Sequence, residues 1–210
     1  MRCYVYVVAR DFGFAPNPFY GRCTLATCKP RIRNSASIGD WVIGWGSSAH
    51  NFSGYLIYAM LVDQKLHFND YWNSKEFRCK RSVLNGSLKQ MYGDNIYHFN
   101  NSQMSWVQAD SHHSHEDGSE NENNKKRDLS SEYVLISSRF WYFGGNPLRL
   151  PTRFRREGSN ICWSGRNYRI IQDENLISQF ISWLETQAEP GYHADPLQFT
   201  SFKRYIGDRH

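Results

Sequence analysis

The sequence lacks any apolar run that approaches the roughly 20 residues needed for a bilayer-spanning helix. Its first residues, MRCYVYVVARDFGF, include a short apolar stretch but no small-residue cleavage site, which argues against a secretory signal. Cysteine is scarce, and its five copies are an odd number at irregular spacing, which favours reduced thiols over a disulfide framework. We therefore expect a cytoplasmic protein with no membrane contact and no structural disulfide.

The motifs of several common nucleotide-binding folds and enzymes are absent as well. No G-x-G-x-x-G follows an expected strand, and no G-x-x-x-x-G-K-[ST] occurs anywhere. The sequence also has no H-E-x-x-H helix, no H-x-E…P-C-x-x-C deaminase pattern and no chain order typical of a Ser-His-Asp enzyme. These absences argue against dinucleotide-binding and phosphate-loop folds.

What is present is enough for one domain with a packed core. The chain has 210 residues, of which 40% are hydrophobic and 16% aromatic. Its net charge is +5, and it rises to +8 when the acidic segment over residues 110–128 is set aside. A basic body rich in aromatic residues is compatible with a nucleic-acid partner, through phosphate neutralisation and base stacking. Many basic proteins bind no nucleic acid, so charge alone does not decide the partner.

Short segments rich in β-branched and aromatic residues predict a series of strands. They cover residues 3–9, 41–45, 55–62, 133–137, part of 140–151, and 167–171. A short helix is expected near Asn69 or Asp70, and a longer amphipathic helix follows a cap at Asp173. Because strands and helices do not alternate regularly, we predict an α+β fold. It would contain a small, mostly antiparallel β-barrel, flanking helices and a C-terminal amphipathic helix.

Residues 111–128 form the most polar stretch of the chain. The segment SHHSHEDGSENENNKKRD contains no aliphatic side chain, and it carries three of the eight histidines. Such a composition buries too little apolar surface to offset the entropy of ordering. We therefore predict a mobile insertion on the surface of a single domain that spans residues 1–210.

The loop over residues 11–33 is the densest candidate for a binding site. Prolines and aromatic rings lie there beside polar groups, and an ordered loop of this length usually has a function. Asn17 could read the amide-like edge of a base, and Lys29 or Arg33 could hold a phosphate. The alternative is a structural plug, whose aromatic residues close one end of the barrel while its charges lie in solvent.

Two cysteines of this loop, Cys23 and Cys28, raise the question of a metal site. Zinc usually needs four ligands, and no second close Cys/His pair follows at the expected distance. We therefore expect no structural metal, and the sequence indicates no cofactor. A nucleophilic Cys28 is a separate possibility because Lys29 is adjacent and a nearby cation lowers a thiol pKa. A buried, inert thiol is the interpretation we favour.

Charged residues outside the loop have two interpretations each. Asp40 and Asp94 both follow a glycine in a turn, and they could serve as a carboxylate pair in general acid/base catalysis. Capping of local backbone amides is the simpler explanation. A basic cluster could follow a phosphate backbone, or it could protect an exposed strand edge from aggregation. This cluster consists of Arg149, Arg153, Arg155 and Arg156.

Several segments carry a resemblance to a known family. They are D-F-G-F-A-P-N-P-F at 11–19, C-T-L-A-T-C-K-P-R-I-R at 23–33, G-D-W-V-I-G at 39–44, L-I-Y-A-M at 56–60 and G-D-N-I-Y at 93–97. In these segments the chain resembles the second of the nucleotide-modification-associated domains, and the resemblance extends to 137–145 and 150–151. The order of strand, long loop and G-D-W strand is also similar to that of the base-binding barrels of the pseudouridine-synthase-associated superfamily.

The resemblance implies a function in the hypermodification of bases in DNA, in a phage-related modification or anti-phage defence system. The expected partners are a nucleotide or DNA that carries a modified base, and other proteins of such a system. The loop would then form a pocket at the mouth of the barrel, with an aromatic wall that stacks on the base. Phe14, Phe19 or Trp41 would supply this wall.

Polar groups of the same pocket would discriminate among base edges. Asn17, Thr24 or Asp40 could fill this role. We prefer a domain that binds the base, and the alternative is an enzyme that uses a carboxylate as acid or base. The carboxylates available for it are Asp11, Asp40 and Asp94. A third possibility is a structural partner of a modification enzyme, which would have no ligand pocket.

Overall fold

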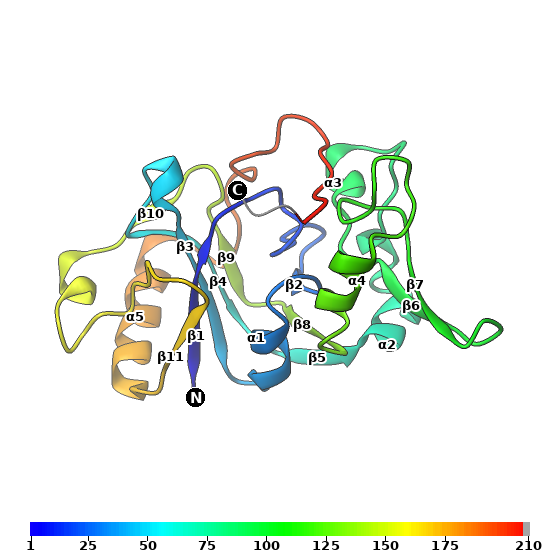
Figure 1. Cartoon of the computed structure of the whole chain (residues 1–210). Helices are drawn as coiled ribbons and strands as arrows, with labels where there is room; N and C mark the ends of the chain where they lie inside the picture. Colours follow the sequence, from blue (N-terminus) through cyan, green and yellow to red (C-terminus); the bar gives the residue numbers. More distant parts are fainter. Residues whose placement is uncertain (208–210) are drawn as a thin grey trace.

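Two open β-sheets face each other in the computed structural model, which describes residues 1–207 (Figure 1). The larger sheet has the strand order β11-β1-β3-β4-β9-β12, with β10 beside β4. Its strands are β1 (Cys3–Val8), β3 (Trp41–Gly46), β4 (Tyr55–Leu61), β9 (Phe140–Tyr142), β10 (Leu148–Arg149), β11 (Tyr168–Ile171) and β12 (Gly191–Tyr192). The smaller sheet has the order β2-β8-β5 and consists of β2 (Cys23–Leu25), β8 (Tyr133–Ser137) and β5 (Gln64–His67).

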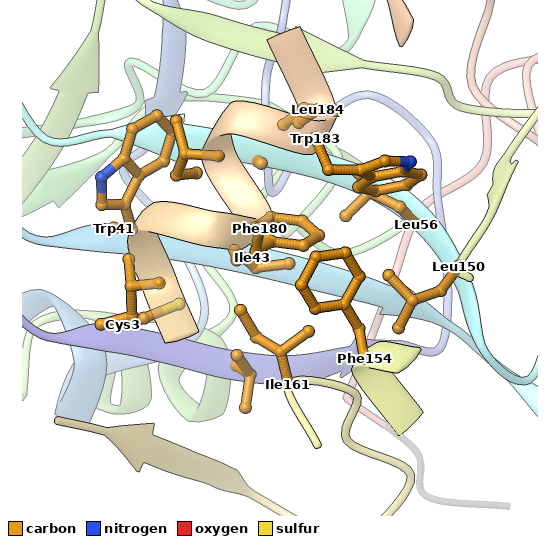
Figure 2. Close-up of a cluster of buried hydrophobic side chains, with 14 of the residues drawn as sticks. Cys3, Trp41, Ile43, Leu56, Leu150, Phe154, Ile161, Phe180, Trp183 and Leu184 are labelled. Carbon is orange, nitrogen blue, oxygen red and sulfur yellow. The ribbon is translucent and has the colours of Figure 1, made fainter. Parts of the chain in front are cut away.

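Alternation along β1 assigns its side chains to the two faces of the larger sheet. Cys3 and Val5 point to one face, while Tyr4 and Tyr6 point to the other, as the period of two in a strand requires. The first face is covered by helix α5 (Glu174–Gln187), and Figure 2 shows Ile43 beside Phe180 of that helix, with Trp41 on the same face of the sheet. The second face meets the smaller sheet, and the two sheets share one buried core.

The expected C-terminal amphipathic helix is confirmed, together with its cap. The Asp173 side chain accepts a hydrogen bond from the backbone N–H of Leu176 at 3.0 Å, so it satisfies one of the free donors of the first turn. The helix buries Leu176, Ile177, Phe180, Ile181, Trp183 and Leu184. Loss of one such aromatic side chain costs about 3–5 kcal/mol of stability. No helix within residues 1–207 is both long enough and apolar enough to cross a membrane.

A third core lies on the far side of the smaller sheet. It is covered by α2 (Phe68–Asn73), by α3 (Leu88–Met91) and by a hairpin of β6 (Tyr97–Asn100) and β7 (Ser105–Gln108). The hairpin projects away from the body of the protein (Figure 1). Phe12 and Phe14 of the long loop enter this core, so the loop joins the two layers.

The α+β class and the mostly antiparallel pairing are confirmed, but the described strands do not form a closed barrel. The path of the larger sheet ends at β11 and β12, which do not pair within residues 1–207. Its β1 and β3 are parallel, which requires a crossover connection, and here the loop and α1 (Pro30–Ser35) make that connection. A set of short strands with frequent turns is compatible with a barrel and with two facing sheets, and strand pairing distinguishes them.

The prediction that residues 111–128 form a solvated surface insertion was wrong, because much of this segment is buried. Its last seven residues form α4 (Glu122–Asp128), and Asn121 caps this helix at the N–H of Asn124. The buried members are Ser111, His112, His113, Ser114, Asn121, Asn124 and Asp128. Hydrogen bonds and stacked imidazole rings hold this segment, so it is ordered without any aliphatic side chain.

Candidate active site

Cys28 lies in a sharp turn between strand β2 and helix α1. Its φ angle is +56° and that of Lys29 is +41°, so two consecutive residues other than glycine occupy the left-handed region. Such a conformation costs of order 1–3 kcal/mol per residue, and it persists only where the surrounding structure enforces it. A nucleophile on a strained strand-to-helix turn is the arrangement used by the nucleophile elbow of hydrolases. The half-buried thiol is therefore presented in a geometry suited to attack.

His113 connects the Cys28 thiol to a buried carboxylate. The Sγ atom of Cys28 is 3.7 Å from Nε2 of His113, and Nδ1 of the same ring is 2.7 Å from Oδ2 of Asp128. The two ring nitrogens thus face different partners, as they do in a nucleophile–histidine–carboxylate triad. Within residues 1–207 no three His, Cys, Asp or Glu side chains are arranged to hold a metal ion. The arrangement is a linear relay and not a convergent set of metal ligands.

The three groups stabilise one another's charged forms. Burial by itself would raise the pKa of the Cys28 thiol, but the charge and hydrogen bond of His113 lower that pKa below its ordinary value. Burial opposes protonation of His113, and Asp128 and Cys28 outweigh it, so the pKa of His113 rises to about 9. The pKa of Asp128 falls to about 2, although burial opposes this as well. These shifts all favour a thiolate–imidazolium pair beside a carboxylate.

Asp128 has a full set of hydrogen-bond partners. Besides His113, its Oδ2 accepts a hydrogen bond from the Tyr97 hydroxyl at 3.0 Å, and its Oδ1 accepts one from the backbone N–H of Cys28 at 2.9 Å. Tyr97 in turn accepts one from the side-chain amide of Gln108 at 2.9 Å. These bonds fix the carboxylate, which then fixes the orientation of the imidazole ring.

Arg33 holds the main chain of the relay in place. Its Nε donates to the carbonyl of Cys28 at 2.9 Å, and its Nη2 donates to the carbonyl of Asp128 at 2.6 Å. Its Nη1 donates to the carbonyls of Ser131 and Tyr133. The side chain is fully buried, so the expectation that Arg33 holds a phosphate is corrected to a positioning function.

Two other residues of the long loop border the relay. The Phe14 ring lies 4.6 Å from that of His113, and it covers the imidazole from the side of the third core. Lys29 follows the thiol directly, and its ammonium lies 4.5 Å from the centre of the Tyr6 ring. Burial lowers the pKa of Lys29, and the Cys28 thiolate opposes that effect. Lys29 is thus a cation next to the thiol in the chain, with its ammonium against the Tyr6 ring.

Asn17 and Thr24 belong to a separate buried network under the loop. Asn17 is fully buried, and its Oδ1 accepts a hydrogen bond at 2.7 Å from Lys80, whose pKa burial lowers to about 8. The Thr24 hydroxyl donates to Asp94 at 2.6 Å, and Tyr71 donates to the other oxygen of that carboxylate at 2.8 Å. Burial raises the pKa of Asp94 despite these bonds. Every polar partner here is internal to the protein, as in the plug interpretation of the loop.

The other expected pocket residues do not meet at one place. Trp41 faces α5 on the far side of the larger sheet, whereas Phe19 lies beside Tyr192 and Phe199 near the loop. Asp40 pairs with Arg2 at 2.8 Å, at the end of the β1–β3 ladder opposite to Asp11.

Asp11 is buried and bonded within the protein. It accepts a hydrogen bond from the Tyr142 hydroxyl at 2.5 Å and another from the backbone N–H of Leu197 at 3.2 Å. Burial raises its pKa, and these bonds oppose the shift. Asp11, Asp40 and Asp94 therefore have separate sets of partners and form no paired carboxylate site.

The basic cluster lies at the other end of the molecule from the relay. Arg149 belongs to β10, and the remaining members lie in or directly after a 3₁₀ turn (Thr152–Arg155). All four arginines are exposed. In Figure 1 this turn lies on the α5 side of the larger sheet, while α4 and α1 lie on the side of the smaller one.

His113 and Asp128 are functional candidates that the sequence analysis missed. They lie in the segment that it assigned to the surface, at 85 and 100 residues from Cys28 along the chain. The signals that pointed towards them were weak: a cysteine before a lysine, and a histidine cluster without a second metal-ligand pair. Sequence spacing alone could not bring these three residues together.

Fold and site together define an α+β protein in which a buried histidine, held by a buried aspartate, contacts a cysteine on a strained turn. The comparison with known families is consistent with the motifs of the long loop. The chain belongs to the family described as nucleotide modification associated domain 2, whose pattern matches residues 1–203. This match confirms the resemblance, and it associates the protein with nucleotide modification. Neither a curated protein nor a solved structure matches the chain.

Proposed function

We propose that this domain is a cysteine-dependent enzyme that transfers an acyl group to or from a nucleotide, either free or as a base in DNA. The observation that carries the proposal is the hydrogen bonding of His113, which faces the Cys28 thiol with one ring nitrogen and Asp128 with the other. Backbone strain and a charged histidine at one partly exposed cysteine are typical of a nucleophile and unusual for an inert thiol.

The chemistry follows from the protonation states of the relay. The Cys28 thiolate attacks the carbonyl carbon of the acyl group, and the leaving nitrogen or oxygen takes the proton from Nε2 of His113. This step leaves a thioester on Cys28 and a neutral imidazole. His113 then removes a proton from water or from an acceptor amine, which attacks the thioester and restores the thiol. Asp128 keeps the imidazole oriented and stabilises its charged form.

The substrate class rests on the family and on the charges at the thiol. The family is associated with nucleotide modification, and Lys29 and Arg127 are cations whose charges act on the Cys28 thiol. Phosphate groups pair well with such cations. A base in DNA, within a phage-related modification or defence system, is the substrate setting that we favour.

The test has two stages. p-Nitrophenyl acetate should give a burst of about one equivalent of nitrophenol and an acetylated Cys28 in the intact mass spectrum. Cys28→Ser should abolish the burst, while Cys79→Ser, at an exposed cysteine, should leave it unchanged. Nucleoside mass spectrometry after incubation with acylated and unacylated nucleotides and DNA then identifies the product. A burst that survives Cys28→Ser contradicts the proposal.

A second candidate function is DNA binding without turnover, and the exposed arginines support it. Four guanidinium groups within eight residues could contact a phosphate backbone. Replacement of Arg153 and Arg155 by Ala should flatten the dependence of DNA affinity on salt, by about one unit of slope for each phosphate that is no longer neutralised. An unchanged slope rules out this surface as the binding site.

A further inference from the structure

The side chain of Tyr205 covers the imidazole rings beside the thiol. Its ring centroid lies 5.7 Å from that of His113 and 6.3 Å from that of His112, and it is inclined by 24° to His112. The guanidinium carbons of Arg10 and Arg127 lie 4.6 Å and 5.6 Å from the centre of the same ring. One aromatic ring is thus held among two cations and two imidazoles.

A hollow of about 240 Å³ opens beside this ring. Phe12 and His112 line it with aromatic surface, and Arg10 and Lys203 add positive charge. Tyr205 lines the hollow as well, and it contacts the His113 ring, which is not part of the lining. A ligand in the hollow would therefore approach His113 and Cys28 through the position of the Tyr205 side chain.

The main chain around Tyr205 is anchored independently of its side chain. The backbone N–H of Tyr205 donates to the carbonyl of His112 at 2.6 Å, and its carbonyl accepts a hydrogen bond from the Asn124 amide at 2.6 Å. Asn121 donates to the carbonyl of Ile206 at 3.2 Å. The phenol ring can thus be removed while the hydrogen bonds that hold this segment remain.

The surroundings of the phenol ring are also suited to a nucleobase. A planar heterocycle would stack on His112 and lie under the guanidinium of Arg10, as bases do on aromatic and Arg platforms. A phosphate attached to it would pair with Arg10 or Lys203, whereas Arg127 already donates to Asn124 and pairs with Asp128. Arg204 is less suited to this role, because Asp110 and the carbonyl of Ser111 already engage it.

We infer that the hollow and the Tyr205 position together form the base subsite of the enzyme, and that Tyr205 occupies this subsite until a nucleotide displaces its side chain. The inference rests on the proposed function, because it is the thiol relay that gives the subsite its reaction. It names the ligand as a nucleoside monophosphate or the equivalent unit of DNA, which enters with its base against His112.

Binding is measured in the Cys28→Ser background, so that no reaction accompanies it. Tyr205→Ala should bind deoxynucleoside monophosphates at least fivefold more tightly than the parent, because the base no longer competes with the phenol. Tyr205→Phe keeps the ring and should behave as the parent does. Inorganic phosphate should gain nothing from Tyr205→Ala, and addition of Arg10→Ala should reverse the gain for the nucleotides.

A second measurement covers the case in which Tyr205→Ala fails to fold. In the protein with its native Tyr205, millimolar nucleoside monophosphate should slow alkylation of Cys28 by iodoacetamide but not that of Cys79. Equal nucleotide affinities of the Ala and Phe variants would contradict the subsite but not the thiol chemistry. If the Ala variant does not fold, the same conclusion follows when nucleotide fails to slow the alkylation of Cys28. If Tyr205→Ala binds nucleotides more tightly but p-nitrophenyl acetate gives no burst at Cys28, the subsite stands and the proposed enzyme activity is contradicted.

Discussion

Replacement of His113 tests the central feature of the site, its thiolate–imidazolium pair. The pKa of His113 rises from 6.5 to about 9, which corresponds to about 3 kcal/mol of free energy. Asp128 and Cys28 supply this energy against the cost of burial. His113→Gln removes the charge and the hydrogen bond that lower the pKa of the Cys28 thiol, so the thiolate population near neutral pH falls. Burial without a counter-charge then raises the pKa of the thiol above its ordinary value.

The assay is the rate of carboxamidomethylation of Cys28 between pH 5 and pH 10, followed by mass spectrometry in a Cys79→Ser background. The reaction of the parent should extend to lower pH than that of an ordinary thiol, because His113 lowers the pKa of Cys28. The reaction of His113→Gln should begin only at a pH beyond the range of an ordinary thiol, about 8.5, because burial without the imidazolium raises the thiol pKa. His115→Gln is the matched control, since His115 is exposed two residues away.

Two outcomes would refute the reasoning. One is an identical pH profile for the parent and His113→Gln, with both proteins shown to be folded by their melting temperatures. The other is an equal loss of reactivity in His115→Gln, which would indicate a general charge effect in place of a specific pair.

Three further predictions concern stability. Arg33→Met should lower the free energy of unfolding by at least about 3 kcal/mol, because four carbonyls lose the hydrogen bonds that the buried guanidinium donates; an unchanged urea midpoint contradicts this. Asn17→Ala should cost about 2–4 kcal/mol, since the buried Lys80 ammonium loses a side-chain acceptor; a melting temperature equal to that of the parent would place Asn17 outside the network. The pKa of Asp128 is lowered from 3.8 to about 2, so its contribution is present above pH 4 and is lost as the pH falls towards 2. The stability advantage of the parent over Asp128→Asn should therefore shrink by about 2 kcal/mol between pH 5 and pH 2 in urea titrations, and a constant difference contradicts the shift.

Local patterns predicted the elements whose signals repeat over a few residues. The run of β-branched and aromatic residues in β1, which is buried on both faces, and the helical period of α5 with its Asp173 cap are examples. The closure of the sheets could not be predicted, since the parallel pairing of β1 with β3 depends on a crossover of more than 30 residues. A barrel and a pair of facing sheets use the same strands.

The candidate site was the part that the sequence predicted least well. Cys28 and Lys29 were identified together, but their partners lie in the polar segment that composition assigned to solvent. The segment was assigned to solvent because it has little apolar surface to bury. Hydrogen bonds and an aromatic contact with Phe14 hold His113 and Asp128 instead. Sequence arguments about disorder fail where polar residues satisfy one another inside the protein.

The contacts of Arg33 join two segments that lie far apart in the chain. Its guanidinium joins the main chain at Cys28 to that at Asp128, which follows 100 residues later. An unfolded or partly synthesised chain has neither contact, and its cysteine has the modest reactivity of a thiol in a peptide. In the proposed enzyme, the thiolate of Cys28 is therefore stabilised only after the native topology has brought His113 and Asp128 to it.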